Sequence, residues 1–206
     1  MEEKKIDEKE SIELILQMIQ STKEYIGIGN GNHFLYWGYF TAILAVVIQS
    51  IYELTGWRQC GWLWMLMFVF WIFMSIIGKR KCNPVMTYTN KVINHVWYAI
   101  GTMFLVTFAV IFTLGIIYNN YKSLDLMMPL SSLYVGIGVS TTGIIIQDKV
   151  TAYLPLTGIG IGLYLLAALY QGLSLEIPAN LLFGLSFVLI MIIPGHVLNK
   201  KENKEC

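Results

Sequence analysis

The sequence predicts an all-α fold, a polytopic membrane protein with a six-helix transmembrane bundle and an N-terminal cytoplasmic amphipathic helix. Hydrophobic residues make up 56% of the 206 residues and charged residues only 13%, which lies outside the usual range of soluble domains. Six apolar stretches each approach the roughly 20 residues that a helix needs to cross a hydrocarbon core. The gaps between them are short and hold charged residues, Asn or Pro.

The predicted spans can be placed in chain order. They run over 33–54, 60–78, 94–118, 126–147, 152–171 and 178–198. Their apolar residues are continuous and do not alternate as in a membrane barrel, so backbone groups in lipid must be satisfied within helices. The first 32 residues carry eleven charges and lack the apolar core of a signal peptide. We therefore expect an N-terminal segment 1–32 that ends in a hinge, a transmembrane domain 33–198 and a tail 199–206.

The positions of lysine and arginine predict the orientation. Twelve of these 14 residues fall on the side that holds the N-terminus, and only Arg58 and Lys122 fall on the other side. Loops in the cytoplasm carry the excess of positive charge. Both termini are therefore expected to face the cytoplasm.

Residues 8–26 are predicted to form the amphipathic helix. Ile12, Ile15 and Ile19 recur at helical spacing. The chain up to the end of this helix carries seven acidic residues against four lysines, whereas helices that bind anionic lipid headgroups are basic. We expect the apolar stripe either to pack on the protein's own inner surface, where the loop 79–91 is basic, or to bind a second copy or a cytosolic protein.

Three glycines, Gly27, Gly29 and Gly31, precede the first span and raise the question of a nucleotide-binding loop. The dinucleotide motif GxGxxG requires a strand before it and a helix after it within a parallel-sheet unit. Here the spacing is GxGxG, a predicted amphipathic helix precedes it and a membrane span follows. We interpret the glycines as a hinge that ends one helix and permits a turn before the next.

Small residues are concentrated in the fourth and fifth spans. Ser132, Gly136 and Ser140 follow one another at four-residue intervals, and Gly158 and Gly162 do the same. Such ladders let helix backbones approach closely, which favours tight packing between these spans or against a neighbouring subunit. The alternative is a substrate groove. The polar residues that would line it are Ser140, Thr141, Thr142 and Gln147.

The three histidines, His33, His95 and His196, are predicted at a similar depth on the cytoplasmic side. Imidazoles at one level could ligate zinc, with Cys82 or water completing the site. Their spacing is unlike a compact zinc signature. The alternative is that each is an amphipathic side chain with its polar tip in the headgroup region.

Chemistry within the membrane is disfavoured. The predicted spans carry no ionisable residue near their midpoints, which argues against a proton-coupled transporter with an acidic carrier. The serines also lie at a different depth from the histidines, so a nucleophile and base pair is not expected. We expect a protein that is not an enzyme, has no cofactor, does not bind nucleic acid and has the lipid bilayer as its constant partner.

Two motifs near the ends of the membrane domain carry a family resemblance. They are HFLYWG at 33–38 and IPGHVLN at 193–199, between a polar helix that ends near Tyr25 and a lysine-rich tail. Together they resemble an uncharacterised family of six-span inner-membrane proteins from Bacteroidetes-type bacteria, often encoded beside a small winged-helix regulator. The resemblance implies a bacterial inner membrane and a regulatory role, and it implies no catalytic residues.

The leading expectation is thus a regulatory or scaffold membrane protein that engages itself or a cytosolic partner through its N-terminal helix. The alternative is a transporter of a small solute or lipid through the small-residue groove of the fourth and fifth spans.

Overall fold

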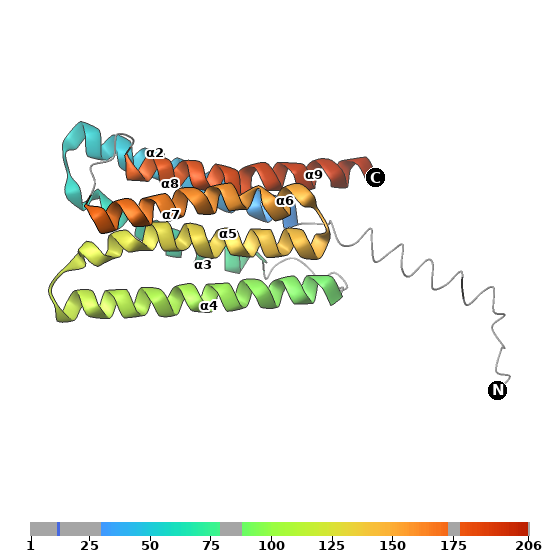
Figure 1. Ribbon diagram of the computed structural model, residues 1–206, viewed down its shortest axis with the longest axis horizontal. Coiled ribbons are helices and arrows are strands. Elements are labelled where there is room, and N and C mark those ends of the chain that lie inside the picture. Colours follow the sequence, from blue (N-terminus) through green and yellow to red (C-terminus); the bar gives the residue numbers. More distant parts are fainter. Residues whose placement is uncertain (1–11, 13–29, 79–87, 173–177, 206) are drawn as a thin grey trace.

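The computed structural model describes residue 12 and residues 30–78, 88–172 and 178–205, and the regular structure of these residues is entirely helical (Figure 1). Six of their helical segments are long and apolar enough to cross a membrane. These segments are Gly31–Thr55, Gln59–Ile77, Tyr88–Ile117, Tyr121–Ile146, Lys149–Gln171 and Ala179–Lys201. The predicted polytopic six-helix bundle is confirmed.

Several of these spans are built from more than one helical element. The elements in chain order are α2 (Asn30–Thr55), η1 (Arg58–Met65), α3 (Leu66–Gly78), α4 (Tyr88–Ile117), η2 (Tyr121–Leu126), α5 (Met127–Ile146), α6 (Lys149–Tyr153), α7 (Pro155–Gln171), α8 (Ala179–Phe187), η3 (Val188–Ile192) and α9 (Ile193–Glu205). The segments η1 and η2 are 3₁₀-helices, and η3 is a π-helical turn. We call the end of the bundle at which α2 begins and α9 ends the terminal end.

The connections follow from residues with particular backbone preferences. Helix α5 ends at Gln147, which adopts the left-handed conformation with φ 61°. Asp148 then caps α6, and Pro155 opens α7, where its missing N–H costs no helical hydrogen bond. Gly172 ends α7 in the left-handed conformation that glycine adopts without strain.

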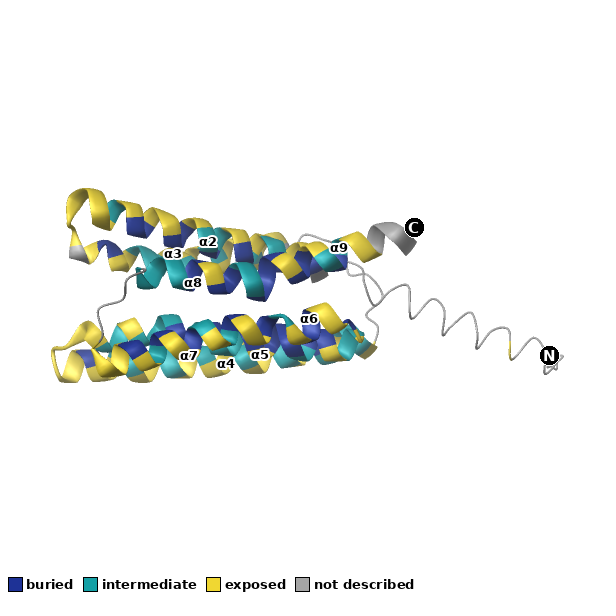
Figure 2. Ribbon diagram, turned by 45° about the horizontal axis from the view of Figure 1, so that its top comes forward, coloured by how far each residue is buried: buried dark blue, intermediate teal, exposed yellow. Residues whose placement is uncertain are grey.

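The helices form two groups that pack face to face. Figure 2 shows α2, α8 and α9 on one side and α4, α5 and α7 on the other. Helix α2 packs along α8, η3 and α9, α5 packs on α7, and α7 joins the groups through α8 and η3. The main core cluster lies between them and consists of Phe34, Val139, Leu165, Phe183, Phe187, Ile190, Met191 and Leu198.

The second and third spans lie at the periphery of the bundle. Only 6% of the second span and 11% of the third are buried, against 56% of the sixth. Aromatic pairs attach α3, since the rings of Phe40 and Phe70 stack with centroids 4.0 Å apart and those of Phe68 and Phe108 lie 5.1 Å apart. Many of the other apolar side chains of α3 and α4 are exposed, as expected of helices solvated by lipid, whereas Ile93 is buried and Trp97 packs against the main core cluster.

The sixth span contains the π-helical turn η3. The amide of Ile193 donates to the carbonyl of Val188, five residues earlier, whereas an α-helix uses the carbonyl four residues earlier. Pro194 follows immediately; it has no N–H, and its ring would clash with the carbonyl four residues before it. The wider turn lets the helix continue through this proline.

Candidate functional site

The two sequence motifs from opposite ends of the membrane domain lie side by side at the terminal end, where α2 packs on α9. A Cβ atom added at Gly31 would overlap the side chain of Asn199 and lie 3.0 Å from the carbonyl oxygen of Gly195. A Cβ atom added at Gly195 would lie 2.9 Å from Leu35 Cδ2. The two helices therefore meet backbone against backbone, which only glycine permits here.

Two hydrogen bonds lie beside this glycine contact. Tyr39 Oη and His196 Nε2 are 2.7 Å apart, and Asn199 Nδ2 donates to Asn32 Oδ1 over 2.7 Å. Each bond joins residues more than 150 positions apart in the chain. We call this arrangement the α2–α9 junction, defined by Gly31, Asn32, Tyr39, Gly195, His196 and Asn199.

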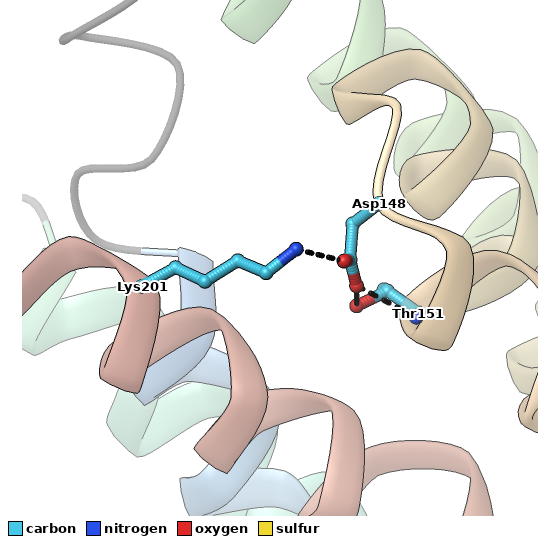
Figure 3. A network of polar contacts seen from close by, with 3 residues as sticks. All are labelled: Asp148, Thr151 and Lys201. Atoms are coloured by element: carbon cyan, nitrogen blue, oxygen red, sulfur yellow. Dashed lines mark hydrogen bonds and ion pairs between the residues drawn. The ribbon is translucent and has the colours of Figure 1, made fainter. Parts of the chain in front are cut away.

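A buried carboxylate joins α9 to the turn between α5 and α6 (Figure 3). The Asp148 side chain is 4% exposed and forms an ion pair with Lys201, whose side chain is 58% exposed. Asp148 Oδ2 also accepts hydrogen bonds from the Thr151 amide at 2.8 Å and the Thr151 hydroxyl at 2.5 Å. The turn is tight, since a Cβ atom at Gly143 would lie 2.7 Å from Ala152 Cα.

The surroundings of Asp148 set its protonation. Burial alone would raise the pKa of the carboxyl group, but the hydrogen bonds from Lys201 and from the Thr151 side chain and amide outweigh burial and hold the pKa below its ordinary value. The group is therefore a carboxylate at neutral pH, and it stabilises the contact between α6 and α9.

The small residues of the fourth and fifth spans are in close contact with neighbouring helices. A Cβ atom at Gly162 would lie 2.9 Å from Ser132 Cβ, one at Gly136 2.9 Å from Ile159 Cδ1, and one at Gly158 2.9 Å from Ile190 Cδ1. In addition, the hydroxyls of Ser132 and Ser186 lie 3.1 Å apart and are fully buried. These contacts are those of close helix packing, and they fill the space beside the small residues.

The polar residues proposed to line a groove have different surroundings. Thr142 is buried and accepts a hydrogen bond from Trp97 Nε1 over 3.2 Å. Thr141 donates to the carbonyl of its own helix four residues earlier. Gln147 is exposed in the turn, while Ser140 is buried with its hydroxyl unpartnered among the described residues.

The three histidines have separate partners. His33 lies beside Trp37, with ring centroids 6.4 Å apart, and His95 Nδ1 contacts the carbonyl of Lys91 at 2.7 Å. His196 belongs to the α2–α9 junction. Within the described part of the chain no group of three or more His, Cys, Asp or Glu residues could hold a metal ion, so the zinc hypothesis gains no support from the geometry. Its fourth predicted ligand, Cys82, lies outside the described residues.

Only part of the predicted N-terminal interaction segment can be located. Ile12 is helical and 59% exposed. Ile15 and Ile19 lie outside the described residues, as do the rest of the predicted amphipathic helix, Gly27 and Gly29. Gly31 belongs to α2 and not to a turn before it. Its small size allows the close contact between α2 and α9 in the α2–α9 junction.

Sequence reasoning missed the pairing of Asp148 with Lys201. One signal could have indicated it: Asp148 is a lone acid next to a lysine on the side of the membrane that is otherwise rich in lysine. An acid in such a place pairs with a cation when it is buried. The sequence does not indicate which lysine this is.

A comparison of the chain with protein-family models, with curated proteins and with solved structures gives no match. The family suggested by the two motifs is therefore not identified. The two motifs nevertheless meet in the structure, where Leu35 packs against Gly195, and the α2 residues of the α2–α9 junction flank the first motif.

Proposed function

We propose that this protein is a non-enzymatic regulatory or scaffold component of a bacterial inner membrane. It binds a second copy of itself or a cytosolic protein through its N-terminal segment, and both of its termini face the cytoplasm. The distribution of lysine and arginine supports this orientation, and the six apolar helical segments support a multi-pass protein in a bilayer.

The α2–α9 junction is the observation on which this proposal depends. It attaches the start of the first span to the end of the last through a glycine contact and two hydrogen bonds. A partner bound to the N-terminal segment would thus be attached to the end of the bundle at which the first and last spans are held together. The segment offers Ile12, Ile15 and Ile19 as apolar anchors, and apolar helix faces of this kind are normally buried against another surface.

Transport of a small solute or lipid through the fourth and fifth spans is the rival function. It has less support, because neighbouring side chains occupy the space beside Gly136, Gly158 and Gly162. The polar residues expected to line the route also point to different partners.

Native mass spectrometry tests the proposal. The full-length protein, purified in a mild detergent, is compared with a variant that lacks residues 1–26 and with the double variant Ile15→Glu/Ile19→Glu. We expect the full-length protein to carry a second copy or a co-purifying protein, which both variants lose. If all three forms are the same species and each retains a small molecule, the function lies in the bundle and the proposal is wrong.

A further inference from the structure

A patch of lysines lies at the terminal end, which we call the basic rim and define as Lys149, Lys200 and Lys201. All three side chains are exposed. The ion pair between Lys201 and Asp148 brings α9 against α6 (Figure 3). Lys149 directly follows Asp148 and Lys200 directly precedes Lys201, so the ion pair holds both residues at the same end of the bundle. Among the described side chains, Lys149 and Lys200 form no ion pair.

Helix α2 begins beside this rim. Gly31, at the start of α2, is in contact with Asn199, the residue before Lys200. Residues 27–30 join the segment to this point, and four residues reach about 14 Å at full extension. The segment 1–26 carries seven acidic residues against four lysines, a net charge of −3.

We propose that in the free protein the acidic segment 1–26 lies against the basic rim and is released when a partner binds it. The inference rests on the proposed function, since it describes how access to Ile12, Ile15 and Ile19 is controlled. It names a surface next to the point of attachment, whereas the loop 79–91 is one of the alternatives that the sequence suggests.

Charge and tethering together support this contact. An exposed ion pair contributes little alone, but a short tether gives the segment a high effective concentration at the rim. The tail also carries Glu202 and Glu205, which reduce its positive charge and keep the contact reversible. Salt should weaken it, because exposed charges are screened.

Zero-length carbodiimide crosslinking of the full-length protein tests the proposal. The protein is reconstituted in nanodiscs of phosphatidylcholine, and monomeric products are analysed by peptide mass spectrometry. We expect crosslinks from Lys149 and Lys200 to Glu8, Glu10 or Glu13, and at least a threefold loss of these products in 0.5 M NaCl. Lys122 is exposed at the end of the bundle opposite the terminal end. It is the internal control and should form no crosslink to these glutamates.

A variant of the basic rim gives a second test, and its melting temperature shows whether the fold is intact. Lys149→Gln/Lys200→Gln should keep the melting temperature of the wild type, because neither lysine has a described ion-pair partner, and should expose segment 1–26 to trypsin at Lys9 and Lys23 at least fivefold faster. Unchanged cleavage would overturn the proposal.

The alternative occupants give distinct outcomes. Crosslinks to Lys79 or Lys81 would assign the segment to the loop, and crosslinks between copies would assign it to a dimer; either result overturns the proposal. A third result also overturns the proposal. If the Lys149 and Lys200 crosslinks are lost when half of the lipid is phosphatidylglycerol, anionic lipid binds the basic rim in place of segment 1–26. If Lys149 and Lys200 form the expected crosslinks but native mass spectrometry finds no second copy or co-purifying protein, the proposed function is wrong and the contact between segment 1–26 and the basic rim remains supported.

Discussion

Removal of the Lys201 ammonium group is expected to destabilise the terminal end more than removal of the charge on its partner, Asp148. The Asp148 side chain is 4% exposed, whereas that of Lys201 is 58% exposed. In Lys201→Met the carboxylate stays buried and keeps only its two hydrogen bonds from Thr151. In Asp148→Asn the lysine can turn to water, and the Asn side chain can still accept a hydrogen bond from the Thr151 amide. The buried carboxylate left in Lys201→Met is therefore costly, whereas the exposed ammonium group left in Asp148→Asn is not.

The expected size follows from the hydrogen bonds that each substitution removes. A hydrogen bond to a charged group contributes about 1.5–3 kcal/mol, and Lys201 supplies one of the three that Asp148 accepts. Because the lysine is more than half exposed, screening by solvent places the cost of Lys201→Met near the lower end, at about 1.5–2 kcal/mol. Asp148→Asn should cost about 1 kcal/mol. The double variant should cost no more than Lys201→Met alone, since the uncompensated buried charge is gone.

Unfolding by SDS in mixed micelles, followed by tryptophan fluorescence, gives these free energies. Lys122→Met is the matched control, because this exposed lysine lies at the opposite end of the bundle, and we expect it to change stability by less than about 0.5 kcal/mol. A larger cost for Asp148→Asn than for Lys201→Met would refute the reasoning. So would costs that simply add in the double variant.

Acid, packing and hydrogen-bond changes give three further expected outcomes. Since the folded pKa of Asp148 lies below its ordinary value, the stabilisation is complete above about pH 4 and is lost as the pH falls through the folded pKa; the wild-type melting temperature should therefore fall in acid more steeply than that of Asp148→Asn. Gly158→Ala should cost about 1–3 kcal/mol through overpacking, whereas Gly160→Ala, whose Cβ meets open space, should be neutral or stabilising by up to about 1 kcal/mol; equal effects in SDS titration would contradict the packing. Tyr39→Phe removes the hydrogen bond to His196 and should cost about 0.5–1.5 kcal/mol with zinc content unchanged by atomic absorption; loss of zinc would restore the metal hypothesis.

The number of spans and their approximate limits could be predicted because apolar length is a local property of the chain. The limits were least accurate for the third span, which begins at Tyr88 and not at residue 94. The additional residues at the start of this helix include Asn90, Lys91 and other polar residues. A hydropathy criterion therefore places the start of the span only where the helix enters the hydrocarbon. Backbone hydrogen bonding lets the helix continue beyond that depth.

The candidate site could be predicted only in part, because its contacts depend on packing between distant segments. The neighbours of Gly31 in sequence predict a hinge residue, but its role is set by Gly195 and Asn199 in α9. The bond between Tyr39 and His196 joins residues 157 positions apart. Local patterns show that such residues are small or polar, and they do not show which partner each residue meets.

The π-helical turn in the sixth span has a geometric consequence for the tail. Such a turn holds one more residue than the same stretch of α-helix, and each residue rotates the chain by about 100° around the helix axis. The turn η3 therefore determines how α9, which follows it, is rotated about its own axis. With one residue fewer between Val188 and Ile192, Asn199 and Lys201 would be turned by about 100° from their positions against α2 and Asp148, so the length of this single turn determines whether the start of α2 and the end of α9 keep their contacts.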